Sequence, residues 1–145
     1  MLKLYYIPNS RATRPRWLLE ELGVPYELVR LPSALDERKA SNYVKIHPHA
    51  RVPALADDDM TIFESAAIVL YLADKFMDKG LAPALDSPDR GHYLQWNVYS
   101  MVTMEPPIYQ IYRHTQGLPE EQRIPSIEQE ARNTFQEVAR VLETT

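Results

Sequence analysis

The sequence predicts a small mixed α/β domain over residues 1–79, a linker over residues 80–87 and an all-helical region over residues 88–145. Short apolar runs of strand length alternate with helical patterns in the first domain. Beyond the linker the pattern is helical throughout. Alternating strands and helices are typical of a sheet with parallel strands, whereas a purely helical pattern is typical of a separate all-α region.

The first strand is expected over Leu2–Ile7, an apolar and aromatic run that Pro8-Asn9 ends. A helix is expected over Arg14–Leu22. Thr13 is a candidate for its N-cap, and Gly23 is a typical residue to end it.

A second strand is expected over Tyr26–Leu31, followed by a weak or irregular helix over Leu35–Ile46, where apolar positions are sparse. Two short strands, Pro53–Ala56 and Met60–Phe63, flank an acidic turn. The helix expected over Ser65–Phe76 is apolar almost all round, so we expect it to pack on more than one side. The order of elements favours a parallel crossover between the first two strands.

In the helical region, Ser87 is expected to cap a helix that runs to Met104. Pro106-Pro107 is expected to kink or break this helix, because each ring removes a main-chain donor. Ser126 and Gln129 have the spacing of a capping box at the start of a last helix. Apolar residues then recur along one face of that helix: Ile127, Ala131, Phe135, Val138 and Leu142.

The composition is that of a soluble globular protein, with 45% hydrophobic and 25% charged residues. The net charge of −4 argues against nucleic acid as the main partner. No apolar run approaches the ~20 residues of a membrane-spanning helix, and no signal peptide is evident, so a cytoplasmic location is expected. The chain has no cysteine, which excludes disulfides and thiolate metal sites.

The charge is unevenly distributed. Residues 1–80 carry 11 basic and 11 acidic side chains, whereas residues 81–145 carry 5 basic and 9 acidic ones. The first part therefore keeps a group of cations that could receive carboxylates: Arg11, Arg14, Arg16, Arg38, Lys39 and Arg51. The alternative is that these cations form surface pairs of little energetic weight.

Ser10 lies between the first expected strand and the first expected helix, where free N–H groups favour anions. Its hydroxyl could donate a hydrogen bond to a bound thiolate. Lowering a thiol pKa from about 8.5 by ~2 units needs about 2.7 kcal/mol, which a charge-assisted hydrogen bond and a helix terminus can supply. The alternative is that Ser10 only caps a turn. Tyr5 and Tyr6 offer competing hydroxyls, although a strand would direct them to opposite faces.

Two further segments have a binding interpretation beside a structural one. Val52-Pro53 could present main-chain groups to an extended peptide, or it could be an ordinary start of an edge strand. Glu64 and Ser65 could hold an ammonium group and an anion at a helix start, or they could be plain caps. His47 and His49 lie in one loop without a third ligand nearby, so no metal site is expected.

Taken together, these segments resemble the glutathione transferase family. Leu4-Tyr5-Tyr6-Ile7-Pro8-Asn9-Ser10 is similar to the first strand and loop of serine-type members, and residues 17–27 are similar to bacterial relatives. His47-Pro48-His49-Ala50-Arg51-Val52-Pro53 resembles the loop that enters the third strand. Residues 62–72 resemble the last strand and third helix. The resemblance is dense over the first 80 residues and looser beyond them.

The resemblance implies a thioredoxin-like N-terminal domain and an all-helical C-terminal domain. It implies that Ser10 hydrogen-bonds the sulfur of glutathione and that Val52, before a cis Pro53, pairs with the cysteinyl main chain. Glu64 and Ser65 would hold the γ-glutamyl end. Lys39 and Arg51 would lie near the glycyl carboxylate. The second substrate is expected against Tyr99, Thr103 and Pro107.

The resemblance also implies departures and partners. Family members usually have Asn where this chain has His47, Lys or Gln where it has Arg51, and Gly where it has Asn9. It usually continues for further helices, so the helical domain is expected to be partial. Glutathione is the expected co-substrate, a small electrophile the second substrate and a homodimer the expected assembly, with no metal, nucleic acid or membrane involved.

Three functions stay open at this point. The first is conjugation of glutathione to small, mostly apolar electrophiles, as part of detoxification. The second is a non-catalytic glutathione-binding or interaction module on the same fold. The third is a glutathione-dependent isomerase, dehalogenase or peroxidase that uses the same site.

Overall fold

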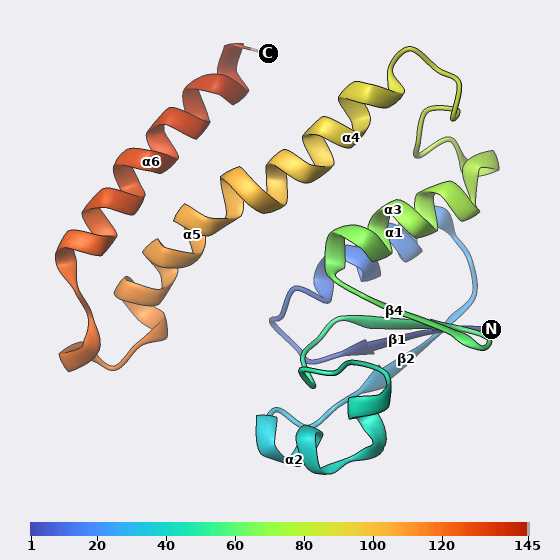
Figure 1. Cartoon of the computed structure of the whole chain (residues 1–145), viewed down its shortest axis with the longest axis horizontal. Helices are drawn as coiled ribbons and strands as arrows, with labels where there is room; N and C mark the ends of the chain where they lie inside the picture. The colour runs from blue at the N-terminus through green and yellow to red at the C-terminus, as the bar shows by residue number, and fades with distance from the viewer. Residues whose placement is uncertain (145) are drawn as a thin grey trace. The chain divides into compact units, whose positions relative to one another are not determined.

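The computed structural model describes residues 1–144 and divides the chain into two compact units. The first unit spans Met1–Arg90, and the second begins at Gly91. Figure 1 shows a sheet with its helices in the first unit and helices alone in the second. Within the described part of the chain, every helix is too short or too polar to cross a bilayer.

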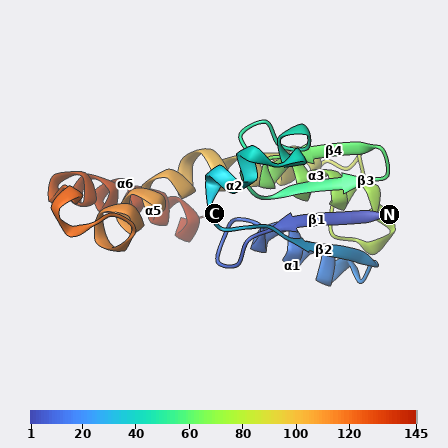
Figure 2. The ribbon, with the colours of Figure 1, turned by 90° about the horizontal axis from the view of Figure 1, so that it is seen from below.

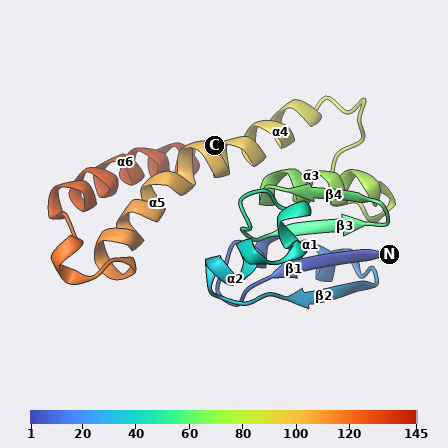
Figure 3. The same cartoon turned by 60° about the horizontal axis from the view of Figure 1, so that its bottom comes forward.

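The first unit is built on a four-stranded sheet in the order β2-β1-β3-β4 (Figure 3). Its strands are β1 (Leu2–Tyr6), β2 (Tyr26–Arg30), β3 (Ala54–Asp57) and β4 (Met60–Phe63). β1 pairs with β2 in parallel, whereas β1–β3 and β3–β4 are antiparallel. The predicted strands and the parallel pairing of the first two are confirmed.

Helices α1 (Thr13–Leu22) and α3 (Ser65–Lys75) pack against each other on one face of the sheet (Figure 2). Side chains from this helix pair and from the sheet form the main core, in which several are fully buried: Leu4, Leu19, Leu55, Ile68 and Leu72. On the other side of the sheet lie α2 (Leu35–Ala40) and a 3-10 turn (Asn42–Lys45) (Figure 1). The thioredoxin-like fold expected for this unit is confirmed.

The ends of α1 differ in part from the prediction. Thr13 is the first helical residue rather than the N-cap, and Ala12 occupies the cap position without a side-chain hydrogen bond. The Thr13 hydroxyl instead donates to the carbonyl of Ser10 at 3.0 Å. Gly23 ends the helix as predicted, with a φ of 64° that favours glycine.

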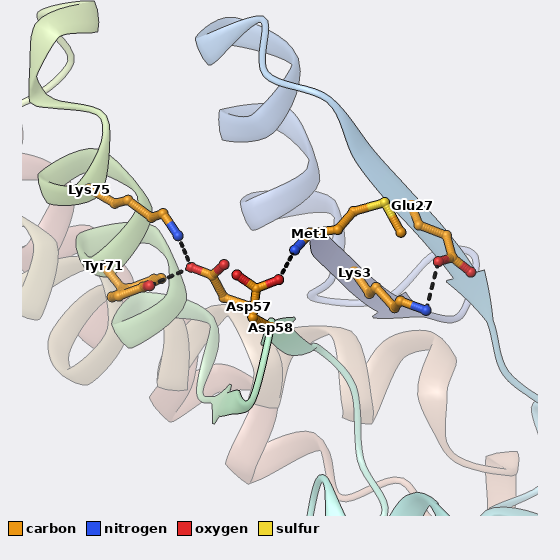
Figure 4. A network of polar contacts seen from close by, with 7 residues as sticks. All are labelled: Met1, Lys3, Glu27, Asp57, Asp58, Tyr71 and Lys75. Atoms are coloured by element: carbon orange, nitrogen blue, oxygen red, sulfur yellow. Dashed lines mark hydrogen bonds and ion pairs between the residues drawn. The ribbon is translucent and has the colours of Figure 1, made fainter.

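A polar network lies at the end of the sheet where β1 begins (Figure 4). The buried Asp57 carboxylate accepts hydrogen bonds from Lys75 and, at 2.5 Å, from the Tyr71 hydroxyl. The contact with Lys75, and then that with Tyr71, lower the pKa of Asp57. Lys3 and Glu27 pair at 3.0 Å across β1 and β2. These contacts join α3 to β3 and the two parallel strands to each other.

The helical part comprises α4 (Arg90–Tyr99), α5 (Glu105–Tyr112) and α6 (Pro125–Thr144), with α5 packed against α6. α4 begins just after Ser87, whose hydroxyl accepts from the Asp89 N–H at 3.2 Å. Wider, π-helical turns follow α4 and α5, over Ser100–Met104 and Arg113–Gly117.

The proline pair does not break the helix as the sequence predicted. Pro106-Pro107 lies in the first turn of α5, directly after the π-helical turn over Ser100–Met104. A missing N–H donor is tolerated in a first turn, and the π-helical turn changes the hydrogen-bond pattern where an α-helical one would lose donors. The chain therefore stays helical through this segment.

The predicted capping box of α6 is wrong, while its apolar face is largely confirmed. Helix α6 begins at Pro125, so Ser126 is already inside its first turn, and the Gln129 side chain donates to Asn133 at 3.1 Å. Most of the predicted apolar face is buried or half-buried: Ile127, Ala131, Phe135 and Val138. Leu142, at the last position of this face, is 45% exposed.

Candidate functional site

The pairing of the strands brings three predicted site segments to one end of the sheet. Tyr5 of β1 is opposite Ala54 of β3, which is in turn opposite Phe63 of β4. The end of β1, the start of β3 and the end of β4 therefore adjoin. The segments that follow or precede these positions meet here: Ser10, Val52-Pro53 and Glu64-Ser65.

Ser10 is half-buried in the turn between β1 and α1. Its hydroxyl donates to the carbonyl of Ile7 at 2.6 Å and accepts from the Ala12 N–H at 3.3 Å. These contacts match the capping interpretation of Ser10. Because the single hydroxyl proton is directed at Ile7, donation to a bound thiolate requires rotation of that proton about the Cβ–Oγ bond.

The peptide bond between Val52 and Pro53 is cis, as the family resemblance implied. Pro53 is buried directly before the first residue of β3, and Val52 is half-buried. The carbonyl of Arg51, one residue earlier, accepts a hydrogen bond of 2.7 Å from the Tyr43 hydroxyl. A tyrosine of the 3-10 turn therefore fixes the segment that enters β3 through a hydrogen bond to its main chain.

Tyr43 forms a second, smaller core with Ala50 and Ala54 beneath this entry. The ring centroids of Tyr43 and Tyr5 are 5.4 Å apart, so the Tyr5 side chain packs against this smaller core. Burial raises the pKa of the Tyr43 hydroxyl, so it stays protonated and can donate to Arg51. The sequence did not single out Tyr43, because a tyrosine in a polar segment gives no local signal of a tertiary contact.

Arg38 of α2 is buried, unlike the other cations of the predicted basic group. Its guanidinium donates to the carbonyls of Pro32, Ser33 and Ala50 at 2.6, 2.7 and 2.8 Å. Three of its five N–H groups thus bind main chain rather than a carboxylate. Arg38 organises the loop before the strand entry.

Lys39 and Arg51 are both exposed. Arg38 donates a buried hydrogen bond to the carbonyl of Ala50. Lys39 follows Arg38 on α2, and Arg51 follows Ala50 in the loop before β3. Both cations thus directly follow a residue of this buried hydrogen bond, and Arg51 directly precedes the Val52-Pro53 segment. A carboxylate is a suitable anion for such a pair.

Glu64 and Ser65 stand at the start of α3, as predicted, but neither acts as a side-chain cap. Glu64 is exposed and has a φ of 73°, a conformation that costs a non-glycine residue about 1–3 kcal/mol and that clusters at ligand-binding sites. Ser65 is buried, and its hydroxyl accepts a hydrogen bond of 3.2 Å from Arg14 of α1. Glu64 therefore makes no capping bond with its side chain, and its binding role stays a prediction.

Arg14 contacts the start of α3, and the sequence did not separate it from its basic neighbours. It lies in the first turn of α1, and its guanidinium reaches the first turn of α3. The packing of α1 against α3 causes this contact. A cation beside Ser65 adds positive charge to a helix terminus that already favours anions.

The residues expected at a second substrate belong to the helical unit. Tyr99 ends α4, and its ring lies 5.2 Å from that of Trp96 in an edge-on contact. Thr103 is exposed in the π-helical turn, and Pro107 is buried in the first turn of α5. Their role as a binding surface stays a prediction.

His47 and His49 contact each other edge-on at 6.1 Å between ring centroids. Over residues 1–144 the structure contains no group of three or more His, Cys, Asp or Glu side chains arranged to hold a metal ion.

Residues 1–74, half of the chain, match the family model described as the N-terminal domain of glutathione S-transferase. The chain belongs to the glutathione S-transferase family. Solved structures of the family agree with this fold. The match to the structure "Ure2p in Complex with Glutathione" has a TM-score of 0.87 and 27% identity. It covers 99% of this chain and 61% of the Ure2p chain. Glutathione transferase URE2P8 of Phanerochaete chrysosporium, solved with oxidized glutathione, has a TM-score of 0.88 and 30% identity to this chain. The match covers 99% of this chain and 66% of URE2P8.

Relatives of this family member carry two kinds of name. Glutathione S-transferase 3 of Schizosaccharomyces pombe is 35% identical over 109 residues, and Arabidopsis thaliana glutathione S-transferase F9 is 30% identical over 132 residues. These alignments span 75% and 86% of the chain but 45% and 60% of the relatives. The transcriptional regulator URE2 of Saccharomyces cerevisiae is 39% identical over 85 residues, which are 57% of the chain and 24% of URE2.

Proposed function

We propose that this chain binds glutathione at the end of the sheet where β3 begins and transfers it to small, mostly apolar electrophiles. The observation that supports the proposal best is the convergence of Ser10, the Val52-Pro53 main chain and the start of α3 at that end. This convergence offers main-chain pairing for a peptide beside separate anion- and cation-binding groups. Because the chain spans only about half of its curated relatives, the activity of a whole protein is part of the proposal.

Each group of the site has a role in this proposal. The Ser10 hydroxyl donates to the glutathione sulfur and favours the thiolate, as serine-type and bacterial members of the family are expected to do. The Val52 main chain pairs with the cysteinyl residue. Glu64 binds the γ-glutamyl ammonium, and Ser65 binds the γ-glutamyl carboxylate.

The glycyl carboxylate is assigned to Lys39 and Arg51. The thiolate then attacks the electrophilic carbon and a C–S bond forms. Either a leaving group departs from that carbon with the bonding electron pair, or, in an addition to a double bond, the neighbouring carbon receives that pair and takes up a proton. The protein contributes a lowered thiol pKa and orientation of the sulfur. We assign the second substrate to Tyr99, Thr103 and Pro107.

A non-catalytic glutathione-binding module is the second candidate. The similarity to URE2, a transcriptional regulator by name, supports it. The Ser10 proton also supports it, because that proton is directed at the Ile7 carbonyl. Isomerisation, dehalogenation and peroxide reduction remain alternatives that use the same bound thiolate.

Isothermal titration with glutathione beside a conjugation assay with 1-chloro-2,4-dinitrobenzene separates these candidates. Saturable binding together with conjugation above the rate without protein supports the transferase. Binding without conjugation supports the module. Absence of binding contradicts both.

We also propose a cytoplasmic homodimer. The support is a row of exposed apolar side chains at helical spacing along α4 and the turn after it, which are Leu94, Val98 and Val102. Sedimentation velocity at micromolar concentration tests the assembly. A single monomeric species would contradict it.

A further inference from the structure

His47 is a buried imidazole in the loop that leads into the proposed glutathione site, with 5% of its surface exposed. The main-chain N–H of His47 donates to the carbonyl of Tyr43 at 2.9 Å, and the His47 carbonyl accepts from the Ala50 N–H at 2.8 Å. These bonds close a turn over residues 47–50. Ala50 has a φ of 51°, and Arg51 follows directly.

The side chain of His47 holds the same turn. Its Nδ1 accepts a hydrogen bond of 3.3 Å from the main-chain N–H of His49. An imidazole nitrogen accepts only when it is unprotonated, so this bond exists only in neutral His47. Protonation would place two N–H donors face to face at this point.

The ring of His47 also contacts the end of β4. It stacks on Phe63 with 4.6 Å between centroids and 28° between planes, and Phe63 directly precedes Glu64. His47 thus contacts both the loop before Val52 and the residue before Glu64. The ring lies between two segments to which we assign glutathione contacts.

The charged and titratable groups that act on His47 come from both segments. Burial is the main cause that lowers the pKa of His47 below its usual 6.5. Glu64 opposes this shift, whereas His49 and Arg51 add to it. Neutral His47 therefore predominates at pH 7, and its change of charge falls below pH 6.5.

We propose that His47 is a positioning residue that links glutathione affinity to pH: neutral His47 orders the turn before Arg51-Val52, and protonated His47 weakens glutathione binding. The inference rests on the proposed function of this site. Protonation removes the bond to His49 and so loosens the turn that precedes the main-chain pairing segment. It also turns His47 into a cation that attracts the Glu64 carboxylate. The imidazolium then competes with the γ-glutamyl ammonium for Glu64.

The test is isothermal titration with S-methylglutathione between pH 7.5 and pH 5.0, because this probe has no thiol to titrate. We expect affinity of the unmodified protein to fall about three- to tenfold over this range, the value of one net hydrogen bond. In His47→Asn the amide oxygen can still accept from the N–H two residues on, but it does not titrate. Its affinity is expected to change less than about twofold over the same range.

His49→Asn is the matched control. It removes the exposed neighbouring imidazole and keeps the main-chain N–H that donates to His47, so we expect it to retain a fall in affinity of the same size. Its midpoint should be the same or higher, because His49 lowers the pKa of His47. An equal loss of affinity in His47→Asn and the unmodified protein would overturn the inference while leaving glutathione binding established. Absence of binding at pH 7.5 would overturn the proposed function, and the inference with it.

A second measurement does not depend on the variant or on glutathione. In the free, isotope-labelled protein, the amide signals of Arg51 and Val52 are expected to shift with the His47 imidazole, with one common midpoint below pH 6.5. Amide signals of this segment that stay unmoved while His47 titrates would overturn the link between the imidazole and the turn.

Discussion

Arg14 of α1 donates a hydrogen bond of 3.2 Å to the buried hydroxyl of Ser65 on α3. The contact spans 51 positions in the sequence and joins the first turns of two helices. At this point two helix termini and a guanidinium concentrate positive potential. We expect the γ-glutamyl carboxylate of glutathione to bind here.

Ser65→Ala is therefore expected to weaken glutathione binding by about tenfold, because the ligand loses a donor and Arg14 loses an acceptor at a buried position. Isothermal titration measures the change. Ser87→Ala is the control. Ser87 is likewise a hydroxyl acceptor of the same unit, bonded to a main-chain N–H instead of a guanidinium, and it is remote in sequence from every site segment. Equal affinities for Ser65→Ala and the unmodified protein would remove Ser65 from the site.

Ser10→Ala is expected to lower kcat/KM for conjugation by about 100-fold, the effect of removing one donor to a developing anion. Affinity for glutathione should change by no more than about threefold, because the sulfur provides a small part of the binding energy. Ser10→Thr retains a hydroxyl and is expected to keep part of the activity. Undiminished turnover in Ser10→Ala would exclude Ser10 as the activating group and direct attention to Tyr6.

Tyr43→Phe and Tyr71→Phe form a matched pair at opposite ends of β3. The first removes the hydrogen bond to the Arg51 carbonyl, and the second removes that to Asp57. Each should lower the free energy of unfolding by about 1 kcal/mol in urea denaturation. Only Tyr43→Phe is expected to weaken glutathione binding, since only Tyr43 supports the Val52-Pro53 segment. A loss of affinity of the same size in Tyr71→Phe would contradict this division.

The stability of the first unit is expected to depend on pH through Asp57. Hydrogen bonds from Lys75 and Tyr71 hold the pKa of Asp57 below its usual 3.8 in the folded state. The resulting stabilisation is complete above pH 3.8 and is lost as the pH falls through the lower, folded-state value.

Asp57→Asn should accordingly lower the free energy of unfolding at pH 7 by about 1–3 kcal/mol, the range for loss of hydrogen bonds to a charged group. The difference from the unmodified protein should shrink as the pH falls below 4. Urea denaturation at several pH values measures it. A destabilisation that is constant between pH 7 and pH 3 would show that the charge of Asp57 has no part in it.

Regular local patterns made the fold predictable. The strands, the parallel pairing and helix α3 follow from apolar periodicity, and the cis bond before Pro53 followed from the family resemblance. The strand order brings the predicted site segments to one end of the sheet.

Hydrogen bonds that form only in the packed structure were not predictable, whether they join two side chains or a side chain and the main chain. The bonds from Tyr43 to Arg51 and from Arg14 to Ser65 depend on how elements pack, and a single sequence carries no local sign of them. The capping box at Ser126 failed because the helix already begins at Pro125, a residue suited to a first turn. The chain does not break at the proline pair, because a π-helical turn, which has no clear sequence signal, precedes it.

The central claim is that glutathione binds at the end of the sheet where β3 begins. Titration of the isotope-labelled protein with glutathione, followed by amide chemical shifts, tests it residue by residue. The account predicts saturable shifts at Ser10, Val52 and Ser65, with little change at the opposite end of β3 around Asp57. Saturable shifts centred on Asp57, or none at any glutathione concentration, would contradict it.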